Sequence, residues 1–220
     1  MISQSTFDFI NELKTNNNRE WFNEHKPKYQ KALAEFVDLM GQMIAIASEF
    51  DPIVGQQEAK KSVFRIYRDI RFSKDKRPYK EHFGGWLSGN PKSDRAGYYI
   101  HLEPGKCMIA GGVWQPQSPR LKSIREEISY NGEQFKSIVE APAFKKMFGN
   151  LQGNELKTAP KGYDKADPLI EYLRKKDFLA IHYLKDEDFM DDKIVSKAKK
   201  IFEGIAPLNA FLNEPFDNGE

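Results

Sequence analysis

The spacing of apolar residues changes period twice along the chain, and this change constrains the fold more than any other feature. In residues 1–50, apolar side chains recur every three or four positions, which is the spacing of helices. Alternation with a period of two then dominates residues 62–114 and predicts strands. Helical spacing returns over 118–213, with one short strand at 178–184. This order predicts an α+β fold, in which an antiparallel β-meander in the middle of the chain packs against N- and C-terminal helices.

The length of 220 residues allows a sizeable apolar core, and we predict a single domain over residues 1–220. No basic segment followed by an apolar one opens the chain, and no run of about 20 apolar residues occurs. We therefore expect neither a secretory signal nor a membrane partner. The one cysteine, Cys107, excludes a disulfide framework and a multi-cysteine zinc site, and it agrees with a cytoplasmic location.

Charge is distributed unevenly, although the net charge is only +2. Residues 60–80 contain nine basic and two acidic side chains, a local charge of +7, so the remaining 199 residues sum to −5. The near-neutral total excludes a strongly basic nucleic-acid coat protein. Five acids in residues 186–192 form the opposite extreme, and we interpret that run as a solvated surface.

The arginines of the basic run alternate with apolar residues in the strand predicted over 62–72. Arg68 would share a face with Phe64, Ile66 and Ile70, so its guanidinium would need a carboxylate partner. Under this structural interpretation Arg68 belongs to a buried ion network, and its replacement by alanine would cost about 3 to 5 kcal/mol. The carboxylates considered as partners are Glu12, Glu20, Glu35 and Glu103.

The opposite face of that strand favours a functional interpretation. Arg65 and Arg71, with Lys76 and Tyr79 just beyond, could form a cradle for a phosphate or a carboxylate. Asp69 between the two arginines would orient one of them. The structural alternative is an exposed ladder of ion pairs, each contributing only about 0 to 1 kcal/mol.

Two glycine pairs lie in strand-like segments, at 84–85 and 111–112. Each predicts either a bulge or the floor of a pocket, which Trp86 and Trp114 would wall. We predict Arg65, Arg68, Asp69, Arg71, Lys76, Tyr79, Trp86 and Trp114 as ligand-binding residues.

Proton transfer is predicted for His82, which follows the basic run, and for Tyr79 as a second donor. His101 and Glu103 share a strand face and could serve a metal or an acid–base pair, but a two-residue match is a weak signal, and we favour an ordinary hydrogen-bonded histidine. We therefore predict no metal and no cofactor. Cys107, beside Met108 and Ile109, is predicted to be a buried and inert thiol.

The pattern Arg65-x-x-Arg68-Asp69-x-Arg71-Phe72-x-x-x-Lys76-x-x-Tyr79 resembles the signature of a bacterial domain-of-unknown-function family, number 2461. The resemblance covers nearly the whole chain, including segments 7–29, 110–128, 159–174 and 205–212. It implies a single-domain intracellular protein of about this length. It implies no reaction, and the signature residues carry over without a role.

Three hypotheses about function follow. The first is a pocket protein, or an enzyme, that binds a phosphate- or carboxylate-bearing small molecule at the arginine cluster. The second is a nucleic-acid-binding module, because basic residues interleave with Phe64, Tyr67, Phe72, Tyr79 and Trp86. The third is a purely structural ion network. The sequence predicts neither a substrate nor an oligomeric state.

Overall fold

The computed structural model describes residues 1–90 and 94–217, and it confirms the α+β fold. The described residues form ten α-helices and a four-stranded antiparallel sheet with the strand order β1-β2-β3-β4. The strands are β1 (Phe83–Leu87), β2 (Gly97–Leu102), β3 (Met108–Val113) and β4 (Phe178–Tyr183). No helix in the described ranges is long and apolar enough to span a membrane.

The helices are distributed on both sides of the strands in the sequence, as the apolar spacing predicted. Before the sheet come α1 (Gln4–Thr15), α2 (Arg19–Glu24), α3 (Lys26–Ala47), the short 3₁₀ helix η1 (Pro52–Gln56) and α4 (Ala59–Ser62). Between β3 and β4 lie α5 (Ser118–Tyr130), α6 (Gly132–Val139), α7 (Pro142–Phe148) and α8 (Ile170–Leu173). The chain continues after β4 with α9 (Asp186–Met190) and α10 (Ile194–Asp217).

The chain divides into two compact units. Unit 1 comprises Met1–Pro91, Tyr99–Ile109 and Tyr183–Lys199. Unit 2 comprises Lys92–Tyr98, Ala110–His182 and Lys200–Glu220. The single domain expected over the whole chain therefore stays a prediction, and each unit is described by itself.

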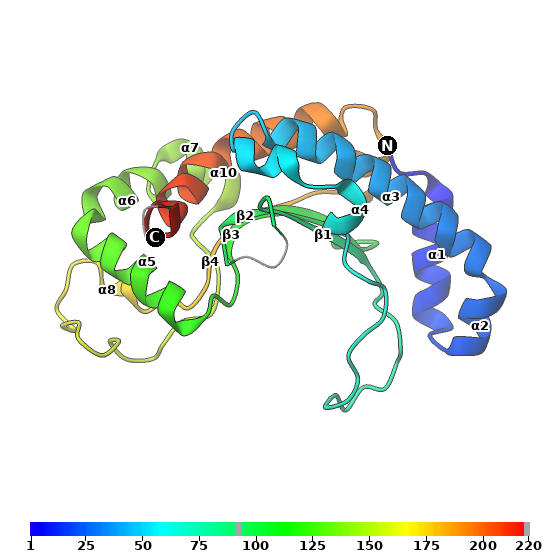
Figure 1. Ribbon diagram of the computed structural model, residues 1–220, viewed down its shortest axis with the longest axis horizontal. Coiled ribbons are helices and arrows are strands. Elements are labelled where there is room, and N and C mark those ends of the chain that lie inside the picture. The colour runs from blue at the N-terminus through cyan, green and yellow to red at the C-terminus, as the bar shows by residue number, and fades with distance from the viewer. Residues whose placement is uncertain (91–93, 218–220) are drawn as a thin grey trace. The chain divides into compact units, whose positions relative to one another are not determined.

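In unit 1, the core forms where α3 packs on β1 (Figure 1). The rings of Phe36 and Phe83 are both buried, and their centroids lie 5.5 Å apart. Gly85 in β1 leaves room for the side chain of Met40, since a Cβ at this position would lie 2.7 Å from the methionine sulfur. The second glycine of this pair therefore serves close packing rather than a bulge.

In unit 2, α10 packs against the parts of β2 and β3 that belong to this unit. The ring centroids of Tyr98 and Phe202 lie 4.4 Å apart, and Ile205 packs over the backbone of Gly111. Asn209 donates a hydrogen bond from Nδ2 to the Gly97 carbonyl at 3.0 Å. Burying a long apolar helix face against strands in this way provides most of the hydrophobic stabilisation of such a layer.

The strand predicted over 62–72 is wrong, because the sheet starts only at Phe83. Residues 64–82, called the arm below, instead form a two-stranded ribbon with isolated bridges at Tyr67–Tyr79 and, next to it, Val63–Gly85 (Figure 1). Its backbone is extended, which explains the period of two, but most of its pairing is with itself. Within the predicted meander, β2 and β3 form a hairpin, and its turn at 103–106 closes with the Lys106 N–H donating to the Glu103 carbonyl.

Candidate functional site

A group of polar side chains lies on one face of β2 in unit 1. Ile100 and Leu102 are fully buried, while the alternate residues Tyr99, His101 and Glu103 point to the other face. His101 is only 9% exposed, so its two ring nitrogens need partners within the protein. The alternation of β2 thus lines up a phenol, an imidazole and a carboxylate.

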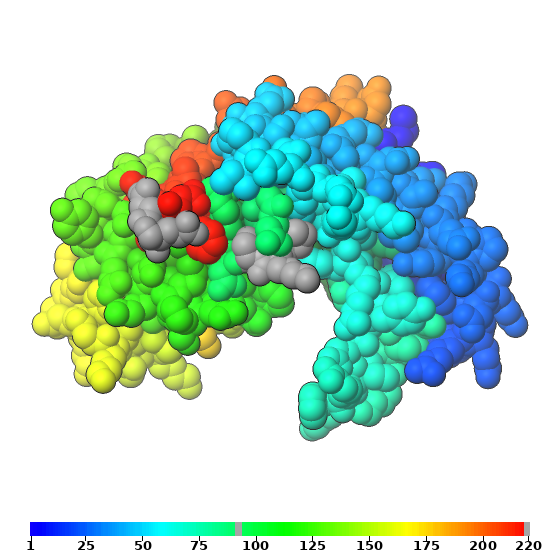
Figure 2. Space-filling model, viewed as in Figure 1, coloured from blue at the N-terminus to red at the C-terminus, as the bar shows by residue number. Residues whose placement is uncertain are grey.

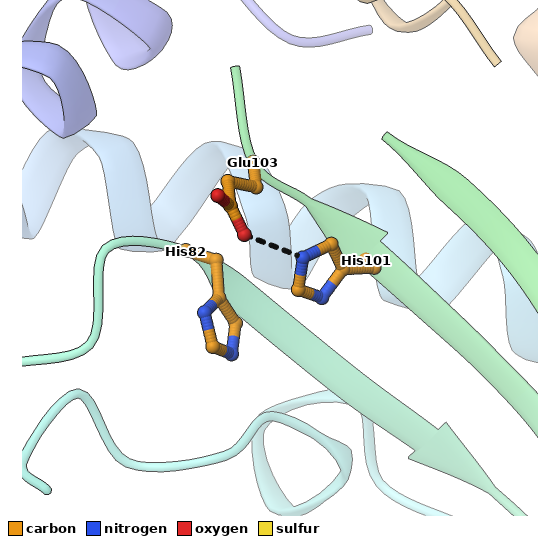
Figure 3. A group of neighbouring side chains, drawn as sticks. All are labelled: His82, His101 and Glu103. Atoms are coloured by element: carbon orange, nitrogen blue, oxygen red, sulfur yellow. Dashed lines mark hydrogen bonds and ion pairs between the residues drawn. The ribbon is translucent and has the colours of Figure 1, made fainter. Parts of the chain in front are cut away.

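His82 joins this group from the position just before the neighbouring strand. It directly precedes β1, and its ring centroid lies 4.4 Å from that of His101 (Figure 3). His82, His101 and Glu103 each offer one ligand atom, and these three atoms all lie within 4.8 Å of one another. Two strands of one sheet therefore bring together two imidazoles and a carboxylate, which we call the His–His–Glu cluster.

Hydrogen bonds hold His101 and Glu103 of the cluster in a fixed orientation. The Tyr99 hydroxyl lies 2.8 Å from His101 Nδ1, and Nε2 of the same ring lies 3.1 Å from Glu103 Oε2. Lys106 donates from Nζ to the other carboxylate oxygen, Oε1, at 2.9 Å. Each half of the Glu103 carboxylate thus has its own partner, and both nitrogens of His101 are engaged.

Gly84 explains how Tyr99 reaches this position. A Cβ on Gly84 would lie 2.7 Å from the Tyr99 hydroxyl oxygen, closer than real Cβ contacts come. The first glycine of the 84–85 pair therefore makes space for a side chain of the site, rather than for a ligand.

Burial and neighbouring charges shift the protonation equilibria of the group. Burial, assisted by the charge of His101, lowers the pKa of His82 to about 4, and burial also lowers the pKa of His101. Burial and the Glu103 carboxylate raise the pKa of Tyr99. For Glu103, burial opposes ionisation, but the bonds from Lys106 and His101 outweigh it and its pKa is lowered. At neutral pH the site therefore holds neutral rings beside an ionised carboxylate.

The arginines of the signature lie on the arm, and most are already paired. Arg71 makes a two-pronged contact with Asp69, through Nε at 3.0 Å and Nη2 at 2.7 Å. Hydrogen bonds from Arg71 lower the pKa of Asp69 to about 2. Arg77 contacts both Asp75 and Glu81. These pairs fix the shape of the ribbon and use guanidinium donors that an anion would need.

Arg68 also has a partner, but none of the four glutamates considered above is that partner. Its Nη1 lies 2.8 Å from Asp75 Oδ2 and donates to the Arg77 carbonyl at 3.0 Å. The side chain is 27% exposed. The face of the arm that carries Arg68 was expected to be apolar and covered, but the arm lies outside the sheet and this face is only partly covered. The ion pair between Arg68 and Asp75 is therefore not buried.

We therefore expect Arg68→Ala to be well tolerated. A partly exposed ion pair contributes little, and the melting temperature should change by less than about 3 °C. Thermal unfolding followed by circular dichroism measures this, with Arg71→Ala as the matched exposed control. A fall of 10 °C or more, roughly the cost of a buried pair, would restore the structural-network hypothesis.

The other predicted site residues have different surroundings. Tyr79 is buried and its ring stacks on Phe22 of α2 at 4.0 Å, so it anchors the base of the arm. Lys76 donates to the Ile70 carbonyl at 3.0 Å. Trp86 lies half-buried in β1 of unit 1, and Trp114 is an exposed residue of unit 2. Of the two residues predicted for proton transfer, only His82 lies in the cluster.

Sequence reasoning missed Tyr99 and Lys106, and it treated His101 and Glu103 as an isolated pair. The spacing of Tyr99, His101 and Glu103 along one strand face was a usable signal. Cys107 agrees with its prediction, since it is buried and burial raises the pKa of its thiol to about 12.

A comparison with protein-family models finds a match over most of the chain. The model of a family described as "Conserved hypothetical protein (DUF2461)" matches residues 5–211. Searches of curated proteins and of solved structures found no match. The match covers the arm, the sheet and nearly all of the helices.

Proposed function

Because the chain belongs to the DUF2461 family, whose description states no activity, we propose a function from the geometry of the site: the protein binds a divalent metal ion of the zinc class through His82, His101 and Glu103. One observation carries this proposal: three ligand atoms of suitable type lie within 4.8 Å of one another. Imidazole and carboxylate ligands in this combination suit zinc and its first-row neighbours.

The spacing within the cluster fits a shared metal. Two ligand atoms bound to zinc at about 2.0–2.1 Å in tetrahedral geometry lie about 3.3 Å apart. The separation of His101 Nε2 and Glu103 Oε2 is 3.1 Å, so the pair needs little movement to accept an ion between them.

The surrounding residues support the same interpretation. Metal-binding histidines usually engage their second nitrogen with another group, which fixes the orientation of the ring. Tyr99 does this for His101, and Lys106 holds the carboxylate oxygen that does not face the cluster. The strands supply a rigid frame, as a pre-organised site requires.

Three protein ligands leave one tetrahedral position open, and a metal of this class lowers the pKa of water bound there. We therefore propose hydrolysis as the reaction class. The cytoplasmic location is kept as part of the proposal, because the one cysteine is a buried free thiol.

We keep the hypothesis of an anionic substrate, but we assign the binding of its negative group to a residue other than the arginines. Arg71, Arg68 and Arg77 are occupied by carboxylates. Lys80 is better placed, because it stands two residues before His82 and has no carboxylate within ion-pair distance in the described part of the chain. Its Nζ lies 5.4 Å from the Phe64 ring centre, and that ring stacks on Tyr99. We propose that Lys80 attracts the negative group of the substrate.

Metal analysis of untagged protein tests the proposal. After dialysis against zinc and then buffer, wild type should retain about one equivalent, and His82→Gln should weaken affinity at least about tenfold. His182→Gln is the matched control, because His182 lies in unit 2, where its Nδ1 contacts the Met147 carbonyl. No retained zinc in wild type, or equal losses in the two variants, would refute the metal site.

A further inference from the structure

The arm carries exposed aromatic rings together with unpaired positive charge. Phe64, Tyr67 and Phe72 are 40%, 54% and 96% exposed. Isolated exposed apolar residues are ordinary, but here three aromatic rings lie on one ribbon of nineteen residues, 64–82. The outer part of the arm projects from the body of unit 1 (Figure 2). Phe64 and Tyr67 also pack within unit 1, with ring centroids 6.1 Å from Tyr99 and 6.3 Å from Phe22. Phe72, near the tip, stacks on no other ring among the described residues.

The charge of the arm is not balanced by its own acids. It contains seven basic and three acidic side chains, a net charge of +4. Three of the arginines have carboxylate partners. The remaining four basic residues have none within ion-pair distance among the described residues, and they are Arg65, Lys74, Lys76 and Lys80.

The arm is also held in place at its base. Tyr79 stacks on Phe22, and Asn17 exchanges two hydrogen bonds of 3.0 Å with the backbone of Tyr79. The internal ion pairs keep the ribbon extended toward Phe72. Rings fixed in this way lose little conformational entropy when a partner stacks on them.

We infer that the arm is a docking element for single-stranded nucleic acid, whose bases stack on Phe72, Tyr67 and Phe64 and whose phosphates face the unpaired cations. Exposed rings interleaved with positive charge are the chemistry of sequence-tolerant single-strand binding. An acidic protein surface would use the charge but would leave the rings without partners. Duplex DNA would hide its bases from them.

The rings run from the tip of the arm to the cluster. Extended backbone rises about 3.3 Å per residue, so the eight-residue step from Phe64 to Phe72 spans at most about 26 Å, room for several nucleotides. Phe64 stacks on Tyr99 with centroids 6.1 Å apart, and Tyr99 bonds to His101. A strand that follows the arm would bring a phosphodiester to the His–His–Glu cluster.

Binding by the arm needs no metal, so it is tested separately from the proposed function. Fluorescence anisotropy in EDTA would use a labelled oligo(dT) of about 15 nucleotides. Phe72→Ala should weaken binding about tenfold, whereas Tyr130→Ala, which removes an 88% exposed ring from unit 2, should not. Because the assay contains EDTA, it does not depend on whether the metal site binds zinc, so the two proposals can fail separately.

Salt dependence tests the role of the cations. With four phosphates neutralised, affinity should fall about 50-fold between about 50 and 200 mM salt, a logarithmic slope near −3. Lys74→Gln/Lys76→Gln should halve that slope, because it removes two of the four contacts. The control Lys157→Gln/Lys161→Gln removes the same charge from exposed positions of unit 2 and should keep the slope.

Three results would overturn the inference. The first is no binding at the lowest salt concentration. The second is a duplex of equal length that binds as tightly as the single strand while Phe72→Ala has no effect. The third is polyglutamate competing as well as oligo(dT) at matched charge, which would assign the arm to an acidic protein surface.

Discussion

Replacing Gly112 by alanine is expected to destabilise the protein more than any other single methyl addition in the sheet. Gly112 has φ +118°, a conformation that side chains rarely adopt, and a Cβ there would lie 1.8 Å from the Phe178 carbonyl oxygen. The obstacle is backbone of the neighbouring strand, so it cannot rotate away. Strain and the enforced separation of β3 from β4 together should cost about 4 kcal/mol.

Substitutions at two other glycines separate the contribution of backbone strain from that of the contact with Phe178. Gly105→Ala carries strain alone, since φ is +76° and nothing lies within 4 Å of the added atom, so it should cost about 1 kcal/mol. Gly41→Ala in α3 places the methyl in ordinary contact with Ala59 and should stabilise by about 1 kcal/mol. Thermal unfolding should therefore rank Gly41→Ala, Gly105→Ala and Gly112→Ala in falling order of stability. Equal losses for the two strained positions would show that the contact with Phe178 is unimportant.

Much of the fold was predictable because apolar spacing reports which face of an element is buried. It placed the helices of residues 1–50 and the strand predicted at 178–184, which the structure shows as Phe178–Tyr183. It failed over 62–72, where Ile66 is buried and the residues on either side are exposed. A period of two indicates extended backbone with one covered face. It does not reveal whether that face lies in a sheet or in a ribbon packed on a helix.

The candidate site was predictable only in parts. His82 was predicted because it follows the basic run, and His101 and Glu103 were paired because they share one face of a predicted strand. Joining them required the register of β1 against β2, which depends on the whole sheet and not on either segment. The arginine cluster led to a wrong expectation of free guanidinium groups. The density of positive charge was visible in the sequence, but the ion pairs of Arg71 with Asp69 and of Arg68 with Asp75 were not.

The hydroxyl of Tyr99 should matter for metal affinity although it is not a ligand. Tyr99→Phe removes the group that engages His101 Nδ1 at 2.8 Å, so the imidazole loses its fixed orientation and tautomer. We expect zinc to bind about 10- to 100-fold more weakly, the usual cost of losing such a positioning contact. The phenyl ring retains the stacking on Phe64, so the fold should be unaffected.

Isothermal titration calorimetry with zinc would measure this loss of affinity, and the chain offers a matched control. Tyr172→Phe removes a hydroxyl that donates to Glu140 at 2.7 Å in unit 2, and it should leave zinc affinity unchanged. Gly84→Ala should reproduce the Tyr99→Phe result by a different route, because its methyl group would push the Tyr99 hydroxyl away from His101. If Tyr99→Phe binds zinc like wild type while His82→Gln does not, the metal is held without the phenol. The close approach of Tyr99 to Gly84 would then serve packing alone.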